Sequence, residues 1–130
     1  MIVLDASVLI GYLDGNDAYH DSAEALLAAA VDADFAVSSL TLAEVLVSPA
    51  RDGRLDAVLD VVRALEVEQL SLPSDAAPRL AQLRVATGLR MPDCCVLLAA
   101  TDADATVASF DHRLLQAATG QGLAVAGAAP

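Results

Sequence analysis

Residues 1–13 read MIVLDASVLIGYL, and this stretch decides the fold class. Ile2 to Leu4 is a short apolar run that predicts a buried strand, and Ser7 to Leu13 predicts a helix after Asp5. The loop Asp14 to Asp17 is rich in residues that favour turns. A strand that leads directly into a helix is the unit from which α/β folds are built.

The rest of the chain repeats this alternation of short apolar strands and helical segments. We predict further strands at 35–38, 67–72, 106–109 and 123–125. We predict further helices at 23–31, 41–47 with an end near Ser48-Pro49, 55–65, 75–87, 92–100 and 113–118. Strands separated by helices imply a central, mostly parallel sheet of four to five strands flanked by helices. Since no linker or repeat interrupts the chain, we expect residues 1–130 to form one domain with a short Gly/Ala-rich tail from Gly127.

The composition indicates an aliphatic core and an acidic surface. Hydrophobic residues make up 56% of the 130 residues but aromatic residues only 3%, so Ala, Val and Leu must fill the core. Seven basic and 18 acidic residues give a formal net charge of −11. This charge argues against a basic surface that holds nucleic acid by bulk electrostatics. A phosphate substrate would therefore need bound cations or a basic partner chain.

Lysine and cysteine usage removes further classes of protein. All seven basic residues are arginines, which excludes a P-loop and argues against a phospho-aspartyl enzyme built on Asp5. Cys94 and Cys95 are adjacent in an apolar stretch, so we exclude a disulfide framework and interpret both as packing residues. No basic leader precedes the first apolar residues, and no apolar run approaches the roughly 20 residues that span a bilayer. We therefore expect a cytoplasmic protein.

Four carboxylates differ from the other acidic residues in their sequence surroundings. Most acidic residues lie in turns or polar stretches, where solvent keeps them ionised. The exceptions are Asp5, Glu44, Asp93 and Asp111. These four adjoin or interrupt apolar segments at strand-to-helix transitions, where an ionised carboxylate needs a partner. In an open α/β sheet such transitions lie at the carboxyl ends of the strands, so we expect the four to converge in one pocket.

A cluster of carboxylates would repel itself unless it were protonated or neutralised by cations. Hard oxygen ligands of this kind suit Mg²⁺ or Mn²⁺. One or two such ions can hold a phosphate group, lower the pKa of a bound water and stabilise the leaving oxygen. The four carboxylates therefore indicate phosphodiester hydrolysis at a metal site.

Each of the four acids also has a simpler interpretation as a helix cap. Thr41 and Glu44 fit a capping box, and Asp93 lies at a predicted helix start. Asp5 and Asp111 are placed to cap the helices that follow them. The alternative hypothesis is thus a non-catalytic acidic binding module in which the carboxylates stabilise helices.

Four short motifs, taken in order, resemble those of the PIN-domain nucleases, particularly the VapC-type toxins of bacterial toxin-antitoxin pairs. The motifs are Asp5-Ala6-Ser7, Thr41-Leu42-Ala43-Glu44, Met91-Pro92-Asp93 and Ser109-Phe110-Asp111. Each motif alone occurs by chance in many proteins, whereas the ordered set in a chain of this length is specific. The similarity spans nearly the whole chain and implies a PIN-like α/β fold.

The resemblance also implies an activity and the residues that carry it. It implies an endoribonuclease toxin that uses Mg²⁺, with Mn²⁺ as the alternative ion. Asp5, Glu44 and Asp93 would bind the metal directly or through water, and Asp111 would complete the catalytic site. The polar residues of the motifs would orient carboxylates or waters; these are Ser7, Thr41 and Ser109, the last at a position where threonine is commoner.

Partners follow from the same resemblance. It implies a homodimer, a substrate such as tRNA or other structured or single-stranded RNA, and a cognate VapB-type antitoxin whose C-terminal segment blocks the acidic site. Arg90 and Arg113 flank the presumed site and are candidate RNA contacts, although solvated arginines or ion pairs explain them equally well. His20 and His112 lack ligand spacing, so we interpret them as surface or capping residues.

Overall fold

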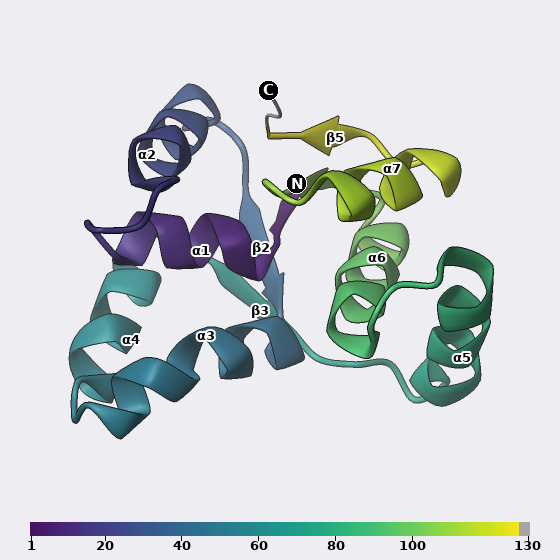
Figure 1. Cartoon of the computed structure of the whole chain (residues 1–130), viewed down its shortest axis with the longest axis horizontal. Helices are drawn as coiled ribbons and strands as arrows, with labels where there is room; N and C mark the ends of the chain where they lie inside the picture. Colours follow the sequence, from purple (N-terminus) through teal and green to yellow (C-terminus); the bar gives the residue numbers. More distant parts are fainter. Residues whose placement is uncertain (128–130) are drawn as a thin grey trace.

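A five-stranded parallel sheet forms the centre of the molecule in the computed structural model, which describes residues 1–127 (Figure 1). The strands are β1 (Ile2–Leu4), β2 (Phe35–Ser38), β3 (Glu68–Leu70), β4 (Thr106–Ala108) and β5 (Val125–Ala126). Their order across the sheet is β3-β2-β1-β4-β5, and every neighbouring pair is parallel. The predicted α/β fold is confirmed. Residues 128–130 of the expected tail lie outside the described part of the chain.

Seven helices within residues 1–127 cover the two faces of this sheet. They are α1 (Ala6–Leu13), α2 (His20–Ala29), α3 (Ser39–Arg51), α4 (Leu55–Ala64), α5 (Ala76–Thr87), α6 (Met91–Ala103) and α7 (His112–Gly120). Figure 1 shows α1 to α4 gathered on one side and α5 to α7 on the other. None of these helices has the length and apolar character needed to cross a membrane.

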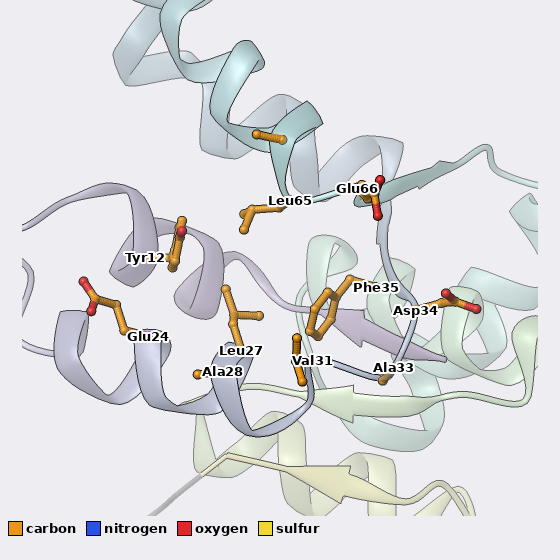
Figure 2. A pocket seen from close by; sticks show the side chains of 11 residues that line it. Tyr12, Glu24, Leu27, Ala28, Val31, Ala33, Asp34, Phe35, Leu65 and Glu66 are labelled. Atoms are coloured by element: carbon orange, nitrogen blue, oxygen red, sulfur yellow. The ribbon is translucent and has the colours of Figure 1, made fainter.

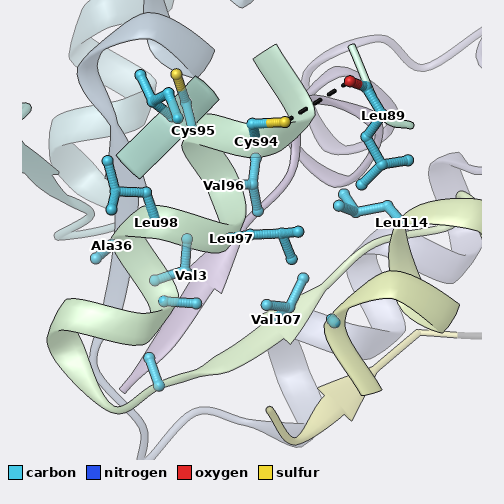
Figure 3. Close-up of a cluster of buried hydrophobic side chains, with 14 of the residues drawn as sticks. Val3, Ala36, Leu89, Cys94, Cys95, Val96, Leu97, Leu98, Val107 and Leu114 are labelled. Carbon is cyan, nitrogen blue, oxygen red and sulfur yellow. Dashed lines mark hydrogen bonds between the residues drawn. The ribbon is translucent and has the colours of Figure 1, made fainter. Parts of the chain in front are cut away.

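Alternating side chains of the central strands supply the two layers of the core. Val3 and Val107 pack with residues of α5, α6 and α7, as Figure 3 shows for Leu97 and Leu114. Their neighbours in the strands point to the opposite face, where Leu4 joins the cluster made by α1 to α4. Both faces of β1 and β4 are therefore covered, as parallel sheets require.

The predicted end of the third helix was wrong. Helix α3 begins at Ser39 and continues through Pro49 to Arg51, whereas an end near Ser48-Pro49 was predicted. Pro49 is buried, and its carbonyl accepts a hydrogen bond of 2.8 Å from the amide of Arg54, just before α4. The proline lies one turn from the helix end, so its missing N–H removes a single bond while its ring packs in the core.

Other boundaries moved by a few residues. Helix α2 begins at His20 rather than at 23, α6 extends to Ala103, and the last strand is β5 at 125–126 rather than 123–125. Helix termini are weakly encoded because the last turn has few hydrogen bonds of its own. The existence and order of all the predicted elements within residues 1–127 are confirmed.

Helices α1 and α2 approach closely at Gly11. A Cβ atom at this position would lie 3.3 Å from both the Ala23 Cβ and the Tyr19 carbonyl oxygen. His20 links the same two helices, because its Nδ1 lies 2.8 Å from the Gly11 carbonyl oxygen and its Nε2 contacts the Glu24 carboxylate at 2.5 Å. His20 is therefore a bridge between helices rather than a free surface residue.

We expect this bridge to make stability depend on pH. The Gly11 carbonyl, followed by Glu24, raises the pKa of His20 above its usual 6.5, because both accept hydrogen bonds from the imidazolium. A raised pKa in the folded state means that the stabilisation is complete below the unfolded pKa and is lost as pH rises through the folded pKa. Thermal melting of wild type and His20→Gln from about pH 5.5 to about pH 8.5 should show a difference that shrinks with pH. A constant difference would contradict the assignment.

Candidate functional site

Asp5 occupies the junction between β1 and α1 at the carboxyl edge of the sheet. Its amide donates a hydrogen bond of 2.9 Å to the Ala108 carbonyl, so β1 and β4 remain paired up to this point. The side chain is only 7% exposed, and its Oδ2 accepts hydrogen bonds from the hydroxyls of Ser7 at 2.8 Å and Ser109 at 2.7 Å. Asp5 does not cap α1 with its side chain, so the capping hypothesis was wrong for this residue.

The two serine hydroxyls are fixed from behind by backbone amides. The Phe110 amide donates to Ser7 Oγ at 3.1 Å, and the Asp111 amide donates to Ser109 Oγ at 2.9 Å. Each hydroxyl oxygen thus accepts from the turn after β4, which leaves its proton free to point at Asp5. This network locks the Asp5 carboxylate and ties the turn between β4 and α7 to the start of α1.

Asp93 experiences the charges of the other three acids. It is the third residue of α6 and is half-buried, and this burial is the largest of the effects that raise the pKa of its carboxyl above 3.8. The charge of Asp5 raises the pKa further, while that of Arg90 lowers it. Asp111 and Glu44 also raise the pKa of Asp93. Four acids from four segments of the sequence are therefore electrostatic neighbours in the fold.

The capping box predicted for Thr41 and Glu44 was wrong, whereas Asp93 lies at a helix start, as predicted, without occupying the N-cap position. Arg90 occupies the N-cap position of α6, and Asp93 lies inside the first turn, where it can only interact with the helix dipole. Helix α3 starts at Ser39, so Thr41 and Glu44 lie within the helix and cannot form a capping box. Glu44 is exposed, whereas Thr41 is buried and donates to none of the four carboxylates within residues 1–127.

Asp111 caps α7, as the alternative hypothesis predicted. Its Oδ1 accepts hydrogen bonds from the amides of Arg113 at 2.9 Å and Leu114 at 3.4 Å. The side chain is exposed and its second oxygen accepts no hydrogen bond from the described residues. One carboxylate can thus cap the helix through Oδ1 while Oδ2 faces solvent.

We expect the cap to contribute measurably to stability. Asp111→Ala should lower the free energy of unfolding by about 0.5 to 2 kcal/mol, because two amides of α7 lose their acceptor. Asp111→Asn should lose much less, since the amide oxygen accepts the same bonds. Urea unfolding of the two variants beside wild type tests this, and equal losses in both would show that charge rather than capping is responsible.

The family model of the PIN domain matches residues 2–120. The chain belongs to the PIN-domain family. PIN domains are generally nucleases. None of the curated proteins matches the chain in sequence.

Solved structures share the fold of this PIN domain at low sequence identity. The VapC20 toxin of Mycobacterium tuberculosis, described as cleaving the sarcin-ricin loop, superposes with a TM-score of 0.75. The sequence identity is 17%, and the match covers 90% of this chain and 95% of that one. A toxin-antitoxin complex from Klebsiella pneumoniae superposes with a TM-score of 0.72 at 19% sequence identity, over 88% of this chain and 90% of that one. VapBC2 from Rickettsia felis, bound to a promoter DNA fragment, superposes with a TM-score of 0.72 at 16% sequence identity, over 97% of this chain and 98% of that one.

The two arginines of this PIN domain differ in their relation to the acids. Arg90 is exposed at the start of α6, and its positive charge lowers the pKa of Asp93, so it lies close enough to interact electrostatically with that carboxylate. Arg113 lines a shallow hollow with Thr87 and Leu89 and is not among the charges that move the pKa of Asp93. The charge of Arg90 thus acts on Asp93, whereas Arg113 contacts the site through its backbone amide at Asp111.

The remaining titratable candidates make no hydrogen bond to the four carboxylates within residues 1–127. His112 is exposed as the first residue of α7. Cys94 and Cys95 are buried in α6, burial raises the pKa of both thiols, and the Cys94 thiol donates to the Leu89 carbonyl at 3.7 Å. The interpretation of the cysteines as packing residues is confirmed.

A large hollow of the PIN domain lies away from the acidic residues. It measures about 580 Å³ and lies between α1, α2 and the turn before β3, where Figure 2 shows Tyr12, Leu27, Phe35 and Leu65 around it. Phe35 is the first residue of β2, so this hollow is at the amino edge of the sheet, opposite the edge that carries Asp5. None of the four carboxylates lines it.

The carboxyl edge of the sheet, with the four carboxylates Asp5, Glu44, Asp93 and Asp111, is called the acidic edge below. Its donor atoms suit a hard divalent cation, although the side chains are too far apart to bind one together. All four side chains offer carboxylate oxygens, which Mg²⁺ and Mn²⁺ prefer. A cation would also relieve the repulsion that raises the pKa of Asp93. Within residues 1–127, no three of these side chains are close enough to hold an ion as they stand. Binding would therefore require these side chains to move closer together, and Glu44 and Asp111 are the exposed members of the four.

Sequence reasoning missed one feature at this edge. Tyr19, from the turn before α2, stacks on Phe110 with ring centroids 4.9 Å apart and an interplanar angle of 9°. Phe110 stands between Ser109 and Asp111 in sequence, so the aromatic pair adjoins the carboxylate network. The scarcity of aromatic residues was the signal that could have drawn attention to it.

Proposed function

We propose that this PIN domain is a metal-dependent endoribonuclease formed by residues 1–130 as a single domain. The observation that carries the proposal is the position of Asp93, whose pKa is raised first by burial and then by the charges of carboxylates from three other segments of the chain. Such an arrangement destabilises the metal-free protein and is retained where cations and phosphates are bound. The site residues proposed are Asp5, Glu44, Asp93 and Asp111.

Each of the four residues has a distinct part in this proposal. Asp5 is the fixed ligand, because two hydroxyls hold its Oδ2 and leave the other oxygen for the ion. Asp93 is the ligand whose raised pKa a cation would lower, and Glu44 and Asp111 would complete the set. When bound, Mg²⁺ or Mn²⁺ supplies a Lewis acid that activates water and stabilises charge on the phosphate. Arg90 would contact a phosphate of the RNA backbone.

We also propose that the protein is a VapC-type toxin with a VapB-type antitoxin and a homodimeric assembly. Similar solved structures described as toxins and toxin-antitoxin complexes support this. A hollow of about 470 Å³ beside Glu44, with apolar walls from Ile10, Leu13 and Val58, would accept apolar side chains of an antitoxin segment. The net charge of −11 favours a basic partner.

Cleavage of a total tRNA pool tests the activity. Purified wild type is compared with Asp93→Asn and with Asp56→Asn, a control that removes the same charge from an exposed position in the first turn of α4. Each protein is assayed with Mg²⁺, with Mn²⁺ and with EDTA. Metal-dependent cleavage by wild type and Asp56→Asn alone would support the proposal. Equal cleavage by Asp93→Asn would reject the assigned site, and metal binding by wild type without any cleavage would favour the non-catalytic module.

Metal binding should also be visible without RNA. A ligand that binds only the folded state at 100 times its Kd raises the free energy of unfolding by about 2.7 kcal/mol. Saturating Mg²⁺ or Mn²⁺ should therefore raise the melting temperature of wild type and of Asp56→Asn, and leave Asp93→Asn nearly unchanged. Equal shifts in all three proteins would indicate general screening of the acidic surface instead of a specific site.

A further inference from the structure

Aromatic side chains are rare in this protein, and their exposure is uneven. The sequence contains two tyrosines, two phenylalanines and no tryptophan. Phe35 is 9% exposed and Phe110 is 6% exposed, so both belong to the core. Tyr12 is half-buried in the hollow at the amino edge of the sheet. Tyr19 is 46% exposed and is therefore the aromatic ring most accessible to a ligand.

Contacts on the inner side of Tyr19 fix its ring. One face covers Phe110, with centroids 4.9 Å apart and planes 9° from parallel. The Tyr19 amide donates to Asp17 Oδ1 at 2.9 Å, and its carbonyl packs against Gly11, so the backbone is held as well. Because the inner face is covered, the exposed area belongs mainly to the outer face and the edge. The result is a rigid aromatic surface directed to solvent.

A short series of contacts connects this surface with the acidic edge. Phe110, beneath Tyr19, donates its amide to the Ser7 hydroxyl, and that hydroxyl donates to Asp5 Oδ2. Phe110 also immediately precedes Asp111. Through Phe110 the aromatic surface is thus joined to the turn between β4 and α7, which carries Asp111 and whose Phe110 amide holds the Ser7 hydroxyl that binds Asp5.

Electrostatics explains why such a surface would matter for RNA. With a net charge of −11 and no lysine, the protein gains little from neutralising RNA phosphates. Contacts to the bases must then supply more of the affinity. Stacking of a base on an aromatic side chain contributes about 1 to 3 kcal/mol and tolerates any base, because every base has a π face.

We propose that the outer face of Tyr19 stacks on a nucleobase of single-stranded RNA adjacent to the phosphate bound at the acidic edge. This inference rests on the proposed ribonuclease function and assigns a positioning residue for its substrate. Tyr19 contacts the base and takes no part in the chemical step. The recognition is by ring stacking, so it selects unpaired RNA without selecting a particular base.

Binding of short single-stranded oligoadenylate tests the stacking directly. Fluorescence anisotropy is measured with Ca²⁺ in place of Mg²⁺, to neutralise the carboxylates with a cation of looser coordination geometry. Tyr19→Phe keeps the ring, and Tyr19→Leu keeps apolar cover over Phe110 without an aromatic face. We expect wild type and Tyr19→Phe to bind alike and Tyr19→Leu to bind roughly 5- to 150-fold more weakly. Equal affinity of the two variants, or no binding by wild type, would overturn the inference.

Two controls separate stacking from a structural role. An oligomer with the same backbone and abasic sugars should bind wild type, Tyr19→Phe and Tyr19→Leu equally; a weaker Tyr19→Leu complex there would overturn the inference. Tyr19→Trp supplies a unique fluorophore in a chain without tryptophan. Its emission should be quenched by oligoadenylate and unaffected by the abasic oligomer, which keeps the test valid if Tyr19→Leu does not fold.

The binding test and the cleavage test can reject their two proposals separately. Loss of cleavage in Asp93→Asn together with equal binding by Tyr19→Phe and Tyr19→Leu would remove only the stacking surface. Stacking by a protein that cleaves no RNA would remove only the catalytic proposal. A Tyr12→Leu variant serves as the aromatic control, since Tyr12 lines the hollow at the opposite edge of the sheet.

Discussion

Asp93→Asn is expected to lower RNA cleavage by more than about 100-fold, because even groups that only support metal ligands contribute about 10- to 100-fold. The same substitution is expected to raise the melting temperature of the metal-free protein. Asp93 is half-buried beside three other carboxylates, so its charge destabilises the folded state when no cation is present. Loss of activity with gain of stability would distinguish a functional acid from a structural one.

The stability gain should follow a defined pH profile. The folded pKa of Asp93 is raised, so the unfolded state releases its proton more easily and is favoured once the pH exceeds the unfolded value of 3.8. The advantage of Asn is therefore present at neutral pH and disappears as pH falls through the folded pKa towards the unfolded one. Thermal melts in EDTA across this range provide the measurement. A variant less stable than wild type at pH 7 would mean that Asp93 makes a stabilising contact that outweighs the repulsion.

Ser109→Ala is expected to have the second largest effect. The Ser109 hydroxyl is fully buried, donates to Asp5 Oδ2 and accepts from the Asp111 amide. Its removal leaves a buried amide without this acceptor and frees the Asp5 carboxylate on one side. We expect a loss of about 1 to 3 kcal/mol in the free energy of unfolding and, by analogy with other supports of metal ligands, about 10- to 100-fold in kcat.

Rescue by threonine makes this prediction specific. Ser109→Thr keeps the hydroxyl and should restore most of the activity, although its additional methyl group must fit in a buried position. The effect of Ser109→Ala should fall on kcat more than on KM, since the hydroxyl orients a ligand and does not contact RNA. An alanine variant as active as wild type, or a threonine variant as inactive as alanine, would show that the hydroxyl has no positioning role.

The sequence by itself determined the alternation of strands and helices and the positions of the four acids within it. Hydrophobic runs of strand length, such as residues 35–38, encode burial on both faces, and burial on both faces is characteristic of a parallel sheet. Once the sheet is parallel, residues that follow its strands share one edge, as Asp5 and Asp111 do. These inferences need only local patterns and the geometry of the βαβ unit.

The tertiary structure alone decided which acids cap helices and which neighbour one another. Local sequence allowed a capping role for each of the four, but only Asp111 accepts cap hydrogen bonds. Helix α3 begins before Thr41, Arg90 takes the N-cap position of α6, and two serine hydroxyls hold the Asp5 carboxylate. The hydrogen bond between Ser109 and Asp5 joins residues 104 positions apart, and the stack of Tyr19 on Phe110 joins residues 91 positions apart. A single sequence encodes local propensity directly, whereas such contacts exist only after the sheet has brought distant segments together.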